Sequence, residues 1–193
     1  MKNILRSTLI LLLVIIRPSI GFSQEPRVPW MQLSAYSLVD SAGKTIHIKP
    51  SKLTVFVLLS PECPLSKNYI PVLNKLVKKN HAAFYGIIPG NAYSAKEVAA
   101  FSKEFKADFS IFIDKSKKLT TTLRGTTTPE CILVNEDGTI HYRGLIDNWA
   151  YSLGKQRKVV TERYLEDALS RIHAGKPILV STTKPVGCLI NDM

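Results

Sequence analysis

One short segment of the chain combines a buried strand, a cysteine–proline pair and a helix. The run at 53–59 (LTVFVLL) is continuously apolar and rich in β-branched residues, which is typical of a strand covered on both faces. Apolar side chains then recur at spacings of three and four residues, which predicts a helix over 64–79. Cys63 and Pro64 lie at the junction, so the sequence places a cysteine where a buried strand becomes a helix.

A cysteine in this position is predicted to be reactive. Proline is well tolerated at the first helical position, because its missing N–H would have no partner there. The unpaired amides and the positive end of the helix dipole stabilise a thiolate. Lys67 is expected to add a positive charge, whereas Glu62 opposes ionisation. We therefore interpret Cys63 as a nucleophile; the alternative is a buried, inert core cysteine.

The rest of the chain alternates strands and helices. Further strands are predicted at 45–48, 82–88, 109–113, 131–134 and 139–142, and further helices at 94–106, 117–123 and 161–175. Ser94 and Glu97 form a capping box, and Thr161 is expected to cap the last helix. This order predicts an α/β fold with a central mixed β-sheet, helices on both faces, and a C-terminal β-hairpin plus helix.

Three segments carry no clear helix or strand pattern. Residues 24–33 are predicted to form an irregular N-terminal segment. Residues 146–160 are predicted to form a polar loop, and residues from about 176 an extended tail.

The first residues predict a signal peptide. Lys2 and Arg6 precede an apolar run at 9–16 that is short for a membrane span. Gly21 and Ser23 then place small residues at the two positions that a signal peptidase needs. We expect a leader over 1–23, one domain over 24–193, and an exported protein that is periplasmic or extracellular. The alternative is an uncleaved leader, which would be the protein's only link to a membrane.

The chain is basic, with a formal net charge of +11. Its lysines and arginines are scattered along the sequence, and aromatic residues do not alternate with them as in a single-strand binder. We therefore expect a solvated basic surface and no nucleic-acid partner.

The three cysteines and four histidines limit which disulfide and metal sites the chain can form. An odd number of cysteines in an oxidising compartment leaves at least one thiol unpaired within the chain. Cys188 lies in the tail, where a resolving cysteine could reach Cys63; its alternative is a tail thiol without a role in turnover. Cys131 is interpreted as a core residue, with a Cys63–Cys131 pairing left open. The histidines show no ligand spacing, so neither metal nor cofactor is expected.

An ordered set of short motifs resembles the thioredoxin-like superfamily, in particular its redoxin branch of the alkyl hydroperoxide reductase/thiol-specific antioxidant type and the peroxiredoxin-like proteins of bacteria. The set covers about 30–190 and comprises Cys63-Pro64, Thr128-Pro129-Glu130, Asp137-Gly138, Arg143-Gly-Leu-Ile-Asp147 and Gly187-Cys188-Leu-Ile190. The resemblance implies a thioredoxin-like fold. It also implies that Pro129, with a cis peptide bond before it, packs beside the reactive sulfur.

The chain departs from the patterns of its relatives at several positions. Ser66 stands where a dithiol oxidoreductase has the second cysteine of Cys-x-x-Cys. In the peroxiredoxin motif, Ser60 can stand for the threonine, but Phe56 occupies the proline position. Arg124 is the best-placed candidate for a peroxidatic arginine; the alternative is a surface charge. A copper-delivery protein would need a cysteine at the position of Lys67.

These features predict a thiol-dependent oxidoreductase of the redoxin type. Cys63 would act as the nucleophile on a peroxide or a protein thiol/disulfide substrate, Cys188 would resolve the product, and an unidentified thiol would donate electrons. The alternative is a non-catalytic thioredoxin-fold module that binds a protein partner or a metal. The sequence predicts no oligomeric state.

Overall fold

The computed structural model describes residues 27–49 and 51–190, so the predicted leader lies outside the described residues. The helices are α1 (Trp30–Ala35), α2 (Pro64–Lys79), α3 (Ala95–Glu104), α4 (Lys118–Thr122) and α5 (Tyr164–His173). The strands are β1 (Leu38–Val39), β2 (Thr45–Ile46), β3 (Leu53–Leu58), β4 (Ala83–Pro89), β5 (Ser110–Asp114), β6 (Thr127–Thr128), β7 (Glu130–Asn135), β8 (Ile140–Gly144), β9 (Ala150–Ser152), β10 (Lys155–Gln156) and β11 (Cys188–Leu189).

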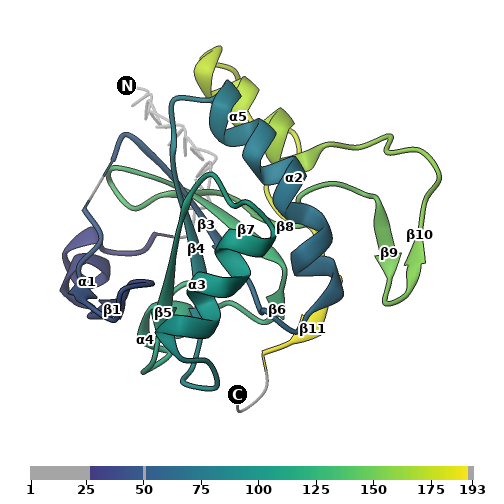
Figure 1. The fold of residues 1–193 in the computed structure, drawn as a ribbon. Helices are drawn as coiled ribbons and strands as arrows, with labels where there is room; N and C mark the ends of the chain where they lie inside the picture. Colours follow the sequence, from purple (N-terminus) through teal and green to yellow (C-terminus); the bar gives the residue numbers. More distant parts are fainter. Residues whose placement is uncertain (1–26, 50, 191–193) are drawn as a thin grey trace, which may run out of the picture.

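A seven-stranded mixed sheet in the order β2-β1-β5-β4-β3-β7-β8 forms the centre of the molecule (Figure 1). Strands β3, β4 and β5 are parallel, as expected for strands joined by helices. Strands β7 and β8 form an antiparallel hairpin that continues the sheet beyond β3. The strand that leads to Cys63 is therefore central and has a hydrogen-bonded neighbour on each side.

Helices cover both faces of this sheet. Side chains of β3 alternate between two apolar clusters, with Val55 and Val57 in one and Phe56 and Leu58 in the other. The first cluster includes buried residues of α2, α3 and α5, and the second includes buried residues of α1 and α4. The predicted fold class, a mixed sheet between two helical layers with a C-terminal hairpin and helix, is confirmed.

Two predictions about helices are wrong, and the segment predicted to be a polar loop over 146–160 contains the paired strands β9 and β10. Part of the segment at 24–33 that was expected to be irregular forms α1. Trp30 and Leu33 bury their side chains there, and the Trp30 indole N–H donates to the Asn135 carbonyl oxygen. Thr161 does not cap α5, which begins after Arg163. Instead the Thr161 hydroxyl accepts a hydrogen bond from the Asn148 side-chain amide. Long-range partners, which the local pattern cannot reveal, decided both cases.

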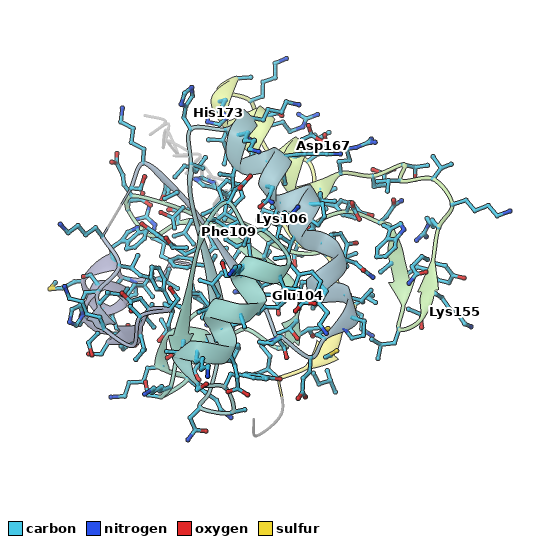
Figure 2. All side chains as sticks on the ribbon, in the orientation of Figure 1. Glu104, Lys106, Phe109, Lys155, Asp167 and His173 are labelled. Atoms are coloured by element: carbon cyan, nitrogen blue, oxygen red, sulfur yellow. The ribbon has the colours of Figure 1, made fainter. Side chains whose placement is uncertain are left out.

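The segment between β8 and α5 extends from the body of the molecule as a two-stranded arm formed by β9 and β10 (Figure 1). Its base is closed by Asn148, whose side-chain oxygen accepts hydrogen bonds from the amides of Thr161 and Glu162. We call residues 148–161 the arm. Figure 2 shows Lys155 on the arm, away from the sheet.

After α5 the chain continues as a tail, residues 176–190, which runs beside β8. The amide of Arg143 on β8 donates to the Ser181 carbonyl oxygen, and the amide of Thr183 donates to the Arg143 carbonyl oxygen. Beyond this attachment, β11 pairs with β6 in a separate two-stranded sheet. The tail predicted to be extended is therefore docked at two places. Within the described ranges, no helix has the length and apolar character needed to cross a membrane.

Candidate functional site

Cys63 is the N-cap residue of α2, and Pro64 is the first residue of that helix. The turn between β3 and α2 is closed by a hydrogen bond from the Cys63 amide to the Ser60 carbonyl oxygen, at 3.1 Å. The Cys63 side chain is only 1% exposed. The strand-to-helix junction predicted from the sequence thus places the sulfur at the positive end of a 16-residue helix.

The loop before β7 lies beside this sulfur. The Thr128–Pro129 peptide bond is cis, as the resemblance implied. The Thr128 carbonyl oxygen is 3.1 Å from Cys63 Sγ and accepts a hydrogen bond from the thiol. Glu130 is buried and its carboxylate accepts hydrogen bonds from the amides of Thr126 and Thr127, which holds the loop in place.

The tail brings Cys188 to the same point. Strand β11 pairs antiparallel with β6, with Cys188 opposite Thr128 and Leu189 opposite Thr127. Cys188 Sγ lies 2.6 Å from Cys63 Sγ, within reach of sulfur–sulfur exchange. The two residues are 125 positions apart in the chain. The tertiary structure therefore assembles a pair of cysteines that the local Cys-x-x-Ser sequence lacks.

Gly187 permits this close approach. A Cβ atom at this position would lie 2.1 Å from the Thr128 carbonyl oxygen, far inside van der Waals contact. The backbone oxygen cannot move without breaking the pairing of β6 with β11. A glycine immediately before Cys188 is thus required for the sulfurs to meet.

The two sulfurs have opposite ionisation tendencies. Burial disfavours a Cys63 thiolate, but hydrogen bonds from Cys188 and Ser66 outweigh burial and lower the pKa of Cys63. Burial, then the hydrogen bond to Cys63 and its charge, raise the pKa of Cys188 to about 12. In the ionised pair, Cys63 is therefore the thiolate and Cys188 is the thiol that donates to it.

Two serines support the site. Ser60, singled out in the sequence, is buried and its hydroxyl lies 3.2 Å from the Tyr93 hydroxyl. Ser66 was interpreted only as a missing cysteine, but its fully buried hydroxyl accepts a hydrogen bond from the Ser60 amide and also stabilises the Cys63 thiolate. Its position three residues after an N-cap cysteine was the signal that it faces the same turn.

The other sequence candidates lie elsewhere. Lys67 Nζ is placed over the Phe105 ring, 5.7 Å from its centroid, rather than among the groups that hydrogen-bond the sulfur. Arg124 is exposed in the turn after α4, where its charge acts on Arg143 rather than on Cys63. Cys131 is fully buried and its thiol points to the carbonyl oxygens of Gly144 and Leu145.

The environment of Cys131 fits a core residue. Burial and the charge of Glu130 raise the pKa of Cys131 well above that of an ordinary thiol, so this cysteine stays protonated. Among the residues that the structure describes, no three His, Cys, Asp or Glu side chains gather in a way that could hold a metal ion.

The titration of Cys63 provides a direct test of this geometry. We expect the first thiolate absorbance band on raising the pH to belong to Cys63, with a midpoint below that of a free thiol. Replacing Cys188 by alanine removes a hydrogen-bond donor and should raise the midpoint, whereas Cys188→Ser keeps a donor and should shift it less. The measurement is ultraviolet absorbance against pH, with Cys63→Ser as the blank. An unchanged midpoint in Cys188→Ala would contradict the assigned role of this hydrogen bond.

The fold is similar to that of several solved structures. A hypothetical protein from Sinorhizobium meliloti matches with a TM-score of 0.72 and 20% identity, over 86% of this chain and 94% of that one. An uncharacterized conserved protein from Geobacillus kaustophilus matches with a TM-score of 0.69 and 20% identity, over 89% and 94%. A secreted disulfide oxidoreductase from Mycobacterium tuberculosis, homologous to E. coli DsbE, matches with a TM-score of 0.50 and 18% identity, over 57% and 82%.

No family model and no curated protein matches the chain. The similarity to solved structures extends over most of the described residues, and the cis-proline loop, the N-terminus of α2 and the central sheet stand in the arrangement that the resemblance implied. The chain therefore has the thioredoxin-like fold.

Proposed function

We propose that the protein is an exported thiol oxidoreductase in which Cys63 and Cys188 form the redox-active pair. The observation that carries the proposal is the 2.6 Å separation of the two sulfurs. The lowered pKa of Cys63 and the two attachments of the tail support it. Export rests on the predicted leader and is consistent with the secreted oxidoreductase of similar fold.

The pair accounts for both halves of a disulfide exchange. The Cys63 thiolate attacks one sulfur of a substrate disulfide and releases the other as a thiolate. Cys63 then carries no charge, so the hydrogen bond and the charge that raise the pKa of Cys188 are removed. Cys188 gives its proton to the released thiolate and attacks the Cys63 sulfur. A second substrate thiolate leaves, and Cys63 and Cys188 remain joined as a disulfide.

Peroxide is a second candidate oxidant, and the burial of the nucleophile favours it. Cys63 is 1% exposed beneath β11, so a small oxidant could reach it more readily than a protein disulfide. The thiolate would attack one peroxide oxygen and release an alcohol or water. The resulting sulfenic acid would condense with the Cys188 thiol to give the same disulfide and a second water.

The remaining alternative is a binding module without turnover. Ser66 in place of the second motif cysteine favoured that interpretation. The position of Cys188 favours the catalytic one, because it brings a second sulfur to 2.6 Å from Cys63 Sγ although the motif position holds Ser66.

Thiol mapping after oxidation tests the proposal. We expect mild oxidation of the reduced protein to produce one intramolecular disulfide, Cys63–Cys188, with Cys131 alkylated only after unfolding because it is fully buried. The measurement is peptide mapping by mass spectrometry, with Cys131→Ser as the control that should form the same disulfide. If all three thiols stay alkylatable, or if Cys63 pairs with Cys131, the proposal is wrong.

Two oxidants separate the candidate substrates. Hydrogen peroxide and a small linear disulfide are compared by the rate at which each generates the Cys63–Cys188 disulfide. A rate with peroxide no greater than that of free cysteine would eliminate peroxide reduction and leave disulfide exchange. Failure of both oxidants would favour the binding module.

A further inference from the structure

The proposed Cys63–Cys188 disulfide has to be reduced again by a partner, and the two sulfurs do not offer equal access. Cys63 is 1% exposed, between the N-terminus of α2, the Thr128 carbonyl oxygen and β11. Cys188 is only partly buried, and its neighbour Leu189 is 64% exposed. An incoming thiolate must approach along the sulfur–sulfur axis, so the outer sulfur is the one it can reach.

A cavity of about 500 Å³ is lined in part by Gly187, the residue before Cys188. It lies between the arm and the tail, and its walls include Tyr151 and Arg157 from the arm and Lys184, Val186 and Gly187 from the tail. Its lining therefore reaches the chain neighbour of the outer sulfur.

The charges around this cavity have one sign. The charged residues that line it are Arg157 and Lys184, and its lining contains no aspartate or glutamate. A wall of cations without acidic residues attracts an acidic surface and raises the rate at which it associates. Two cations and no acid therefore line the cavity that also includes Gly187, the residue before Cys188.

The cationic wall is also held in position. The Arg157 guanidinium donates to the Asn148 carbonyl oxygen at 2.8 Å and lies 5.1 Å from the centre of the Tyr151 ring. Immediately before the arm, the buried Asp147 carboxylate accepts hydrogen bonds from the Tyr69 hydroxyl at 2.6 Å and from the Trp149 amide. The arm is therefore anchored to α2, and Arg157 needs little ordering when a partner binds.

We propose that a thiol-bearing protein with an acidic segment beside its reactive cysteine docks in the cavity between arm and tail and reduces the disulfide by attacking Cys188. This inference rests on the proposed function. It names the class of electron donor that the sequence left unidentified, and it assigns Cys188 as the point where electrons enter.

The reaction balances as a two-electron exchange. The partner thiolate forms a bond to Cys188 Sγ, the Cys188–Cys63 bond breaks, and the electron pair leaves on Cys63 as its thiolate. The lowered pKa of Cys63 favours this direction, because a more acidic thiol is the better leaving group. A second thiol of the partner then attacks the mixed disulfide, which releases Cys188 as a thiol and leaves the partner oxidised.

Two synthetic peptides of equal length test the proposal, one with glutamates and one with lysines around a single cysteine. Each reduces the oxidised full-length protein, whose Cys63–Cys188 disulfide is first verified by mapping. Reactions are stopped with an alkylating agent, and mass spectrometry identifies which cysteine carries the peptide. We expect the peptide on Cys188 and the alkyl group on Cys63. The acidic peptide should react roughly ten times faster or more at low salt, and the difference should shrink as salt is added.

Charge-matched variants separate a local site from the general field of a basic protein. Arg157→Glu with Lys184→Glu should abolish the preference for the acidic peptide. Lys44→Glu with Lys49→Glu makes the same change in net charge at the opposite edge of the sheet and should preserve the preference. Because Arg157 also holds the arm, Lys184→Glu is measured alone and should lower the preference by itself.

The outcomes are distinct. Absence of the Cys63–Cys188 disulfide in the starting protein would overturn the proposed function and this inference together. With that disulfide present, a peptide attached to Cys63, or an equal effect of the two charge-reversed pairs, would overturn this inference alone.

Discussion

Replacing Cys63 by serine is expected to abolish turnover, whereas Cys188→Ser should stop the cycle halfway. A serine hydroxyl at position 63 does not ionise at neutral pH, so the first attack is lost and the rate falls to background, on the order of 10³-fold or more. Cys188→Ser keeps the Cys63 thiol but removes the sulfur that lies 2.6 Å from it. Its first attack should proceed, and a stable mixed disulfide with the substrate should accumulate.

Stopped assays with a small linear disulfide measure both effects, as release of substrate thiol and as mass added to Cys63. Cys131→Ser is the matched control, because this thiol is buried and its pKa is raised well above the ordinary range. It should retain turnover after any loss of stability is taken into account. Full turnover in Cys188→Ser would show that another group resolves the intermediate.

Gly187→Ala is expected to separate the two sulfurs without removing either one. The added Cβ would meet the backbone oxygen of Thr128 at 2.1 Å, so β11 has to move away from β6. Steric overpacking of this kind costs about 1–3 kcal/mol. This cost corresponds to roughly a 5- to 150-fold fall in the population that holds Cys188 against Cys63. The rate of intramolecular disulfide formation should fall by the same factor, measured by quenched alkylation and mass spectrometry.

Gly154→Ala is the control for this variant. Gly154 lies in the arm with a φ of +71° and has open space around an added Cβ, so alanine there strains the backbone without touching the tail. Disulfide formation should proceed at the wild-type rate in Gly154→Ala. An equal fall in both variants would indicate a general loss of stability rather than a displaced β11.

Features determined by neighbouring residues were predictable. The helix expected over 64–79 is α2 with the same bounds, because its apolar spacing and its proline at the first position are local signals. The capping box of Ser94 and Glu97 is present with both of its hydrogen bonds. The buried character of β3 follows from an apolar run that no exposed strand would carry.

Features determined by distant partners could not be predicted from the sequence. Helix α1 depends on Trp30, whose partner Asn135 lies 105 residues away. Thr161 is held by Asn148 rather than by its own helix. Lys67 contacts Phe105 instead of the sulfur four residues before it. In each case a tertiary contact overrides a local preference that is worth about 1 kcal/mol or less.

The candidate site shows the same division between local and distant causes. The sequence by itself determined that Cys63 begins a helix after a buried strand, since propensity, capping and apolar periodicity act over a few residues. Only the tertiary structure decided which sulfur stands beside it, because β11 has to cross from α5 to β6 and a glycine has to clear the Thr128 carbonyl oxygen. The sequence offered two other cysteines. Burial keeps Cys131 in the core, and strand pairing brings Cys188 to the site.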